Sequence, residues 1–264
     1  MSCYVAKSLN QHGEIDWSKE EHCVWHDLVT RQQSIVSETA CQPYLDGLDL
    51  LALSADRVPR LSELNHTLDR ETGWQIAPVP ALISFDHFFA LLADKKFPAA
   101  TFLRSRQEFD YLQEPDFFHE IYGHCAMLTH PDFAAFTHRY GQLGKNASPK
   151  ARAYLARLYW FTVEFGLVKE QGVVKIYGGG ILSSPAETRC ALDKPDSQHR
   201  RFDLLQVLRT PYRIDHIQPV YYVLEEIGEL YSLSQLDLMH YVEQAMALGL
   251  LPAPFTVKEE NYVG

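Results

Sequence analysis

Hydrophobic positions recur at helical spacing over most of the chain. Between residues 20 and 41 the apolar side chains lie three and four positions apart, as at Val24 and Leu28, which is typical of an amphipathic helix. Ser18, followed three residues later by Glu21, forms a capping-box pattern that predicts the start of this helix. The same reasoning predicts further helices over residues 44–51, 61–67 and beyond with Gly73 as the stop, from about 85, 131–140, 148–164, 187–192, 202–208, and two within 224–248.

Shorter stretches have the β-branched and aromatic composition of strands. They are residues 97–103, 165–168, 173–177, 178–182 and 217–223. Residues 76–80 cannot form a central strand, because Pro78 and Pro80 lack the backbone N–H that a sheet needs on both sides. They are expected to form an extended entry to the helix near residue 85, while residues 1–18 are expected to form an extended polar arm and 193–201 a loop. The pattern predicts an α+β, mainly α-helical protein with one domain over residues 1–264.

Composition narrows the class of protein. Hydrophobic residues make up 46% and charged residues 22% of the 264 residues, as in ordinary globular proteins. The 24 basic and 34 acidic residues give a net charge of -10, which argues against nucleic acid or an anionic membrane as partner. Five widely spaced cysteines without a CxxC pattern indicate a reducing compartment, and with no apolar leader we expect a cytoplasmic protein.

Two histidines, His119 and His124, stand five residues apart with Glu120 directly after the first. In the HExxH motif of zinc hydrolases the histidines are four apart and share one helix face. A spacing of five places them about 140° apart on a regular α-helix. We therefore expect the helix to end at Gly123, so that His124 projects from the following turn.

Two histidines and one carboxylate form the facial triad that leaves positions open on a non-haem iron. Glu164 is a candidate for the carboxylate, because an unpaired charge would be costly among its aromatic neighbours Trp160 and Phe165. The pattern of two histidines and a glutamate can also occur by chance, so the residues alone do not decide whether His119 and His124 bind a metal. Likewise Cys125 fits a small buried residue better than a ligand, and Gly178–Gly180 fits a tight bend better than a phosphate-binding loop.

Three longer motifs carry a resemblance to a known family. They read EPDFFHEIYGHCAMLTHPDFAAF, YLARLYWFTVEFGL and IYGGGILSSPAET, and they resemble the aromatic amino acid hydroxylases over about residues 24–248. The resemblance implies a single catalytic domain with small β elements around a non-haem iron site. No regulatory domain and no tetramerisation tail is expected within residues 1–264, so a monomer or dimer is expected.

Matching the motifs position by position assigns the site residues that the resemblance implies. The catalytic iron ligands are His119, His124 and Glu164. The tetrahydropterin-binding residues are Ala81, Leu82, Ile83, Phe88, Glu120, Ala156 and Tyr159. The substrate-binding residues are Arg104, Pro115, Trp160, Phe165, Gly180, Ser183, Glu187 and Tyr221, with Asp116 as the partner of Arg104.

The implied activity is hydroxylation of L-phenylalanine to L-tyrosine with Fe(II), a tetrahydropterin and O2. Val223 and Trp160 resemble the residues of phenylalanine-specific members, although pocket changes of this size discriminate weakly. Tyrosine or tryptophan is therefore an alternative substrate. Two further classes stay open: a zinc hydrolase with Glu120 as general base, and a metal- or pterin-binding protein without catalysis. No nucleic acid or membrane partner is expected.

Overall fold

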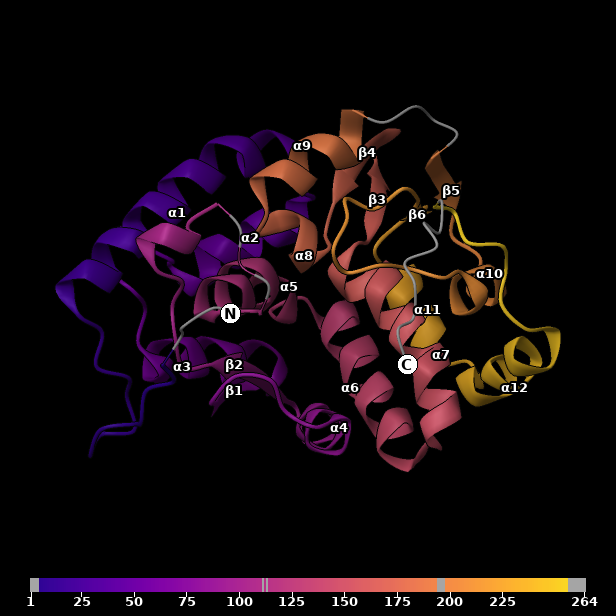
Figure 1. The fold of residues 1–264 in the computed structure, drawn as a ribbon, viewed down its shortest axis with the longest axis horizontal. Coiled ribbons are helices and arrows are strands. Elements are labelled where there is room, and N and C mark those ends of the chain that lie inside the picture. The colour runs from indigo at the N-terminus through magenta and orange to yellow at the C-terminus, as the bar shows by residue number, and fades with distance from the viewer. Residues whose placement is uncertain (1–4, 111, 113, 194–197, 256–264) are drawn as a thin grey trace, which may run out of the picture.

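Helices dominate the architecture, as predicted (Figure 1). The computed structural model describes residues 5–110, 112, 114–193 and 198–255. The first half contains α1 (Lys19–Thr39), α2 (Gln42–Leu51), α3 (Leu61–Thr72), β1 (Gln75–Val79), α4 (Phe85–Ala93), β2 (Lys96–Ala100), the 3₁₀ turn η1 (Arg106–Glu108), the π-helix η2 (His119–Cys125) and α5 (Ala126–Leu128). The second half contains α6 (Pro131–Asn146), α7 (Pro149–Tyr159), the π-helix η3 (Trp160–Glu164), β3 (Leu167–Glu170), β4 (Val173–Ile176), α8 (Gly179–Leu182), α9 (Pro185–Asp193), β5 (His199–Arg201), α10 (Leu204–Arg209), β6 (Tyr221–Leu224), α11 (Glu229–Ser234) and α12 (Leu238–Leu248).

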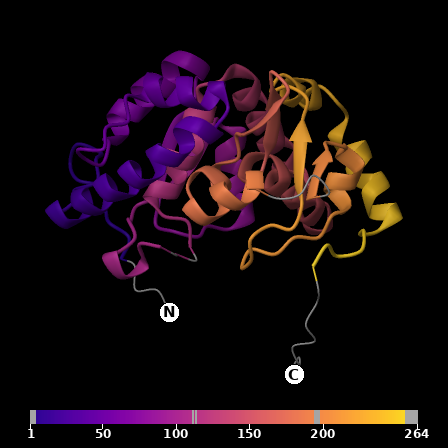
Figure 2. The same ribbon diagram turned by 90° about the horizontal axis from the view of Figure 1, so that it is seen from above.

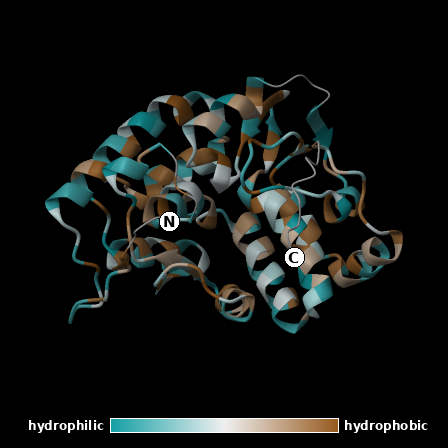
Figure 3. Cartoon of the chain, viewed as in Figure 1, coloured by the Kyte–Doolittle hydropathy of each residue, from teal (hydrophilic) through white to brown (hydrophobic). Residues whose placement is uncertain are grey.

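Helix α1 follows its sequence pattern closely. The predicted capping box is present, since the Ser18 side chain accepts from the backbone N–H of Glu21 and the Glu21 carboxylate accepts from that of Ser18. One face carries the buried side chains of Val24, Trp25 and Leu28, while other positions stay polar. Figure 3 shows this mixture of hydrophilic and hydrophobic residues along α1.

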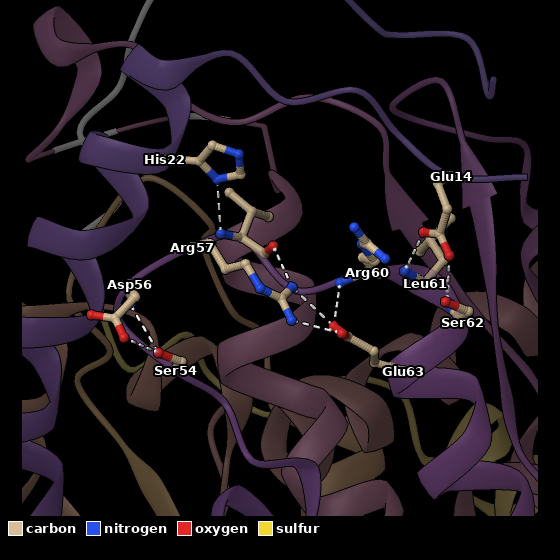
Figure 4. A network of polar contacts seen from close by, with 10 residues as sticks. Glu14, His22, Ser54, Asp56, Arg57, Arg60, Leu61, Ser62 and Glu63 are labelled. Atoms are coloured by element: carbon tan, nitrogen blue, oxygen red, sulfur yellow. Dashed lines mark hydrogen bonds and ion pairs between the residues drawn. The ribbon is translucent and has the colours of Figure 1, made fainter. Parts of the chain in front are cut away.

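The N-terminal arm fastens the start of α3. The carboxylate of Glu14 accepts from the backbone N–H groups of Leu61 (2.7 Å) and Ser62 (3.0 Å), two of the donors that a helix start leaves unpaired (Figure 4). Beside it, Glu63 accepts from the backbone N–H of Arg60. Helix α3 ends at Gly73, the predicted stop, in the left-handed conformation with φ of 73°.

Two small sheets complete the fold. Strands β1 and β2 pair in parallel, so the proline-containing segment does form a strand, but in a sheet of two in which each strand has a free edge. The second sheet has the order β4-β3-β6-β5. The prediction of a loop over residues 193–201 is wrong at β5, which pairs with β6 over three residues and is too short to show a period.

Two glycine-containing segments differ from their predicted structure. The helix predicted over residues 131–140 continues to Asn146, and Gly141 and Gly144 lie within it, where α4 packs closely. A Cβ on Gly144 would stand 2.0 Å from the ring of Phe89. The expected β piece over residues 178–182 is instead the short helix α8.

Most of η2 is buried: residues Ile121–Cys125 are buried, whereas His119 and Glu120 are partly exposed. Helix α8, strand β2 and helix α5 pack around η2. Figure 2 shows the fold from a second direction, with the N-terminal helices at one side and the C-terminal elements at the other. Within the described residues no helix is long and apolar enough to cross a membrane. The described cysteines, Cys23, Cys41, Cys125 and Cys190, are all free thiols, and Cys125 is buried as predicted.

The contact between Glu14 and α3 gives a first prediction. We expect Glu14→Ala to lower the free energy of unfolding by about 1 kcal/mol, the usual worth of a helix N-cap. Urea denaturation measures it. Glu243→Ala, which removes an exposed carboxylate on α12, is the matched control and should leave the midpoint unchanged. Equal loss in both variants would contradict a capping role.

Candidate metal centre and its surroundings

The two histidines meet because the helix that carries them widens rather than ends. Residues His119–Cys125 form a π-helix, and the chain continues directly into α5. In a π-helix the hydrogen bonds join residues five apart, so the fifth residue returns to the same face. The Nε2 atoms of His119 and His124 stand 3.2 Å apart. The prediction that the helix ends at Gly123 is therefore wrong, although the predicted convergence of the two imidazoles is correct.

A second π-helix brings the carboxylate. Residues Trp160–Glu164 form η3, and the N–H of Phe165 donates to the carbonyl of Trp160 at 2.8 Å across five residues. The Glu164 Oε2 atom lies 3.4 Å from Nε2 of His124 and 3.7 Å from Nε2 of His119.

These separations fit one metal ion. Imidazole nitrogens and carboxylate oxygens bind divalent metals at about 2.0–2.2 Å, so ligands at right angles lie about 3 Å apart. The three atoms form a triangle close to that size, with edges of 3.2, 3.4 and 3.7 Å. Three ligands on one side leave the opposite side of the metal open, as a facial triad requires.

Glycines allow the ligands to come together. A Cβ on Gly123 would stand 2.6 Å from the carbonyl oxygen of Gly179, so η2 and α8 touch through their backbones. A Cβ on Gly179 would stand 2.4 Å from the ring of His124, and one on Gly180 would stand 2.8 Å from Glu164 Oε2. The glycine run is thus neither a tight bend nor a phosphate-binding loop; it is the surface against which the ligand side chains rest.

Ser183 fixes the tautomer of His119. The Ser183 hydroxyl donates its single hydrogen to the carbonyl of Gly179 at 2.9 Å. The 2.8 Å contact between the same oxygen and Nδ1 of His119 therefore has the imidazole N–H as donor. This leaves Nε2 of His119 as a lone pair directed at the other two ligand atoms, as a metal ligand needs.

Charge is distributed as metal binding requires. Burial lowers the pKa of His119 to about 4, so its ring is neutral at pH 7. Burial raises the pKa of Glu164, but the two imidazoles outweigh burial and the pKa of Glu164 is lowered, so this carboxylate is ionised.

Glu120 is a second carboxylate close to the histidines. One of its oxygens lies within 4.8 Å of a ring nitrogen of each histidine. Burial, followed by the charges of Glu164 and Asp116, raises the pKa of Glu120 well above its usual range. A metal binds the ionised form of a carboxyl group, which a raised pKa disfavours, whereas Glu164 has a lowered pKa and stands 3.4 and 3.7 Å from the two imidazole nitrogens. Glu164 is therefore the better candidate for the third ligand.

Arg104 forms a buried ion pair next to the metal centre. Its Nε and Nη2 donate to the two carboxylate oxygens of Asp116 at 2.9 and 3.0 Å, which confirms the predicted pairing. Asp116 also accepts from the backbone N–H of His119 at 3.0 Å. The carboxylate of Asp116 therefore positions both the guanidinium of Arg104 and the first turn of η2. Pro115, the residue before it, is half-buried.

An aromatic wall adjoins the triad. The ring of Trp160 lies 4.4 Å from that of Phe165 and 4.4 Å from that of Tyr212, between centroids. Its indole N–H donates to Oε1 of Gln218 at 3.0 Å. Behind the wall, Glu187 accepts from the hydroxyl of Tyr221 at 2.5 Å. Of the predicted substrate-binding residues, Trp160 therefore contacts Phe165, and Glu187 contacts Tyr221. Tyr212 and Gln218, which were not among the predicted site residues, also contact Trp160.

The remaining predicted residues lie on α4, on α7 and in the loop before α4. Phe88 contacts Tyr159 edge to face at 5.5 Å, and the charges of Glu164 and Glu120 add to burial in raising the pKa of Tyr159. Ala156 lines a cavity of about 700 Å³ together with Phe85 and Tyr212. Ala81, Leu82 and Ile83 lie in the loop before α4, where Leu82 is exposed.

Comparison with known proteins places the chain in a family. Residues 4–259 match the family model described as biopterin-dependent aromatic amino acid hydroxylase. The chain belongs to this family of enzymes.

Particular relatives are similar over nearly the whole chain. A phenylalanine-4-hydroxylase of Vibrio cholerae is 67% identical over 264 residues, all of this chain and 91% of the relative. The apo structure of a cold-active phenylalanine hydroxylase from Colwellia psychrerythraea is 52% identical, with a TM-score of 0.92 over 95% of this chain and 97% of that one. The Chromobacterium violaceum phenylalanine hydroxylase, solved with bound iron(III) and oxidised 7,8-dihydrobiopterin, is 39% identical, with a TM-score of 0.85 over 92% of this chain and 88% of that one.

Packing at Gly179 gives a second prediction. We expect Gly179→Ala to displace the ring of His124 and to weaken metal binding at least about tenfold, since ligand orientation alone is worth that much. Anaerobic titration with Fe(II) measures the affinity. Gly228→Ala is the control, because nothing lies closer than 3.8 Å to its added Cβ. Unchanged affinity in Gly179→Ala would show that this contact does not hold His124.

Proposed function

We propose that this enzyme hydroxylates L-phenylalanine to L-tyrosine, using O2, a tetrahydropterin and an iron(II) ion held by His119, His124 and Glu164. The observation that carries the proposal is the triangle of these three ligand atoms, 3.2 to 3.7 Å on a side, in a chain of the biopterin-dependent family. Bound iron and tetrahydropterin supply O2 activation and two electrons; the protein supplies ligands, orientation and a water-poor site.

Arg104 is assigned to the substrate carboxylate. Its pair with Asp116 uses Nε and Nη2, so Nη1 is the nitrogen we assign to that contact. The buried carboxylate keeps the guanidinium in one orientation, which lowers the entropy cost of binding the amino acid. With one end of the substrate fixed, the ring is directed toward the triad by contact with Trp160 and Phe165.

The tetrahydropterin is assigned to the side where Phe88, Tyr159 and Glu120 lie. Phe88 offers an aromatic face, and Ala81, Leu82 and Ile83 offer backbone groups from the adjacent loop. Burial raises the pKa of Glu120, which favours the protonated form that can donate a hydrogen bond to a ring nitrogen or oxygen. The same rise in pKa disfavours the ionised form, which a zinc hydrolase needs in order to accept a proton from water.

L-Phenylalanine is the substrate that the pocket favours. Relatives that are 67% and 52% identical are phenylalanine-4-hydroxylases. Val223, close to Tyr221 in β6, is apolar and buried, and offers nothing to pair with a ring hydroxyl. A tyrosine substrate would leave its hydroxyl without a partner there, which is costly in a buried pocket.

The test is product formation by the iron-loaded protein. Anaerobic loading with Fe(II), followed by O2, tetrahydropterin and each aromatic amino acid in turn, should give tyrosine from L-phenylalanine as the main product. His119→Ala should lose both iron and product, whereas His26→Ala, which removes an exposed histidine on α1, should retain both. Full activity of an iron-free His119→Ala protein would contradict the assignment, as would peptidase or amidase turnover with zinc and no O2 uptake.

Arg104 is best tested by Arg104→Lys. Lysine keeps the charge beside Asp116 and so avoids leaving a buried carboxylate unpaired, but it cannot hold two oxygens and the substrate at once. We expect the KM for L-phenylalanine to rise about tenfold, with a much smaller change in kcat. Steady-state tyrosine formation measures both constants. An unchanged KM would remove Arg104 from the carboxylate role.

A further inference from the structure

The side chain of Gln218 is buried and has a single possible orientation. It lies in the segment between α10 and β6 and is 1% exposed. Its amide nitrogen donates both hydrogens, to the carbonyls of Arg213 and His216 at 2.8 Å each. Because both hydrogens are used there, the amide oxygen must face the other way, toward the indole N–H of Trp160 at 3.0 Å.

The indole of Trp160 is thereby held at its N–H edge by a hydrogen bond, in addition to the ring contacts on its faces. Tyr212, from the same segment, stacks on Trp160 with 18° between the ring planes, and Phe165 lies against it at 33°. The rings alone permit an indole to rotate or slide within its plane. The hydrogen bond to Gln218 removes this freedom, because an indole has one N–H and it points along one direction.

Gln218 also joins the indole to a second proposed substrate residue. Its backbone N–H donates to Oε1 of Glu187 at 3.0 Å, the same oxygen that accepts from Tyr221. On the other side, Trp160 opens the π-helix that ends with Glu164. The side chain thus connects the 213–216 backbone, the indole and the metal-binding helix in one set of contacts.

From these contacts we infer that Gln218 is a positioning residue for the hydroxylation reaction. It orients the Trp160 indole and so sets the place of the substrate ring without touching the substrate. The inference rests on the proposed function, since it takes Trp160 as the ring-binding residue. A ring displaced by a fraction of an ångström is hydroxylated less efficiently, so part of the tetrahydropterin passes its two electrons to O2, which leaves as hydrogen peroxide, and no tyrosine forms.

A double-mutant cycle separates this role from general stability. Gln218→Met keeps the length of the side chain but makes no hydrogen bond, and Trp160→Phe keeps a ring but removes the N–H. In the wild-type background we expect Gln218→Met to lower kcat/KM for L-phenylalanine about fivefold, the value of one neutral hydrogen bond. Tyrosine formed per tetrahydropterin oxidised should also fall. In the Trp160→Phe background the same change should alter kcat/KM by less than about twofold.

Control variants make the result decisive. Thr210→Val removes a buried hydroxyl at the start of the same segment. That hydroxyl is bonded to the hydroxyl of Tyr222 (2.7 Å) and to the carbonyl of Gln206 rather than to Trp160 or Gln218, so the variant should leave the coupling of product to pterin unchanged. Gln218→Ala, which leaves room for water at the two carbonyls, is carried through the same cycle in case Gln218→Met does not fold. An equal loss in both backgrounds, or unchanged kcat/KM and coupling in the single variants, would overturn the inference.

Calorimetry of L-phenylalanine binding to the anaerobic iron-loaded protein supplies a second readout of the cycle. A wild-type protein that binds L-phenylalanine but forms no tyrosine would contradict the proposed function, and the cycle in binding affinity would still test Gln218. A wild-type protein that neither binds nor hydroxylates L-phenylalanine would contradict both the proposed function and the role of Gln218.

Discussion

The close approach of η2 and α8 is the contact on which the rest of the site depends. Gly123 and Gly179 meet through their backbones, with no room for a Cβ on the first. That approach places Gly179 under the ring of His124, Gly180 against Glu164, and Ser183 beside His119. One backbone contact therefore sets the position of all three candidate ligands. π-Helices are rare and concentrate at functional sites, and here each of two carries ligands of the same centre.

The surroundings of the carboxyl groups in the site shift their pKa values in different directions. Burial raises the pKa of both Glu164 and Glu120, but the imidazoles beside Glu164 outweigh burial there and lower its pKa. Arg104 and backbone N–H groups likewise outweigh the burial of Asp116 and lower its pKa. Three carboxyl groups thus differ through their surroundings, and Asp116 connects Arg104 to the backbone of His119.

Local signals predicted the elements that local chemistry determines. The Ser18 capping box, the Gly73 stop and the stripe along α1 appear as expected. The errors fall where distant packing decides. Backbone freedom predicts a helix end at Gly123 and a tight bend at Gly178–Gly180, yet these glycines instead permit close contact with segments far away in sequence. Strand β5 forms only because β6 lies beside it. Gln218 carries no sequence motif, and its contacts appear only once the segment around it is folded.

Metal binding by the two nearby glutamates tests the central claim most directly. Glu164, and not Glu120, is the proposed third metal ligand, although both carboxylates lie near the histidines. Anaerobic Fe(II) titration should give one tightly bound ion per chain in the wild type and in Glu120→Gln, and greatly weakened binding in Glu164→Gln. Retained binding in Glu164→Gln together with loss in Glu120→Gln would contradict the account.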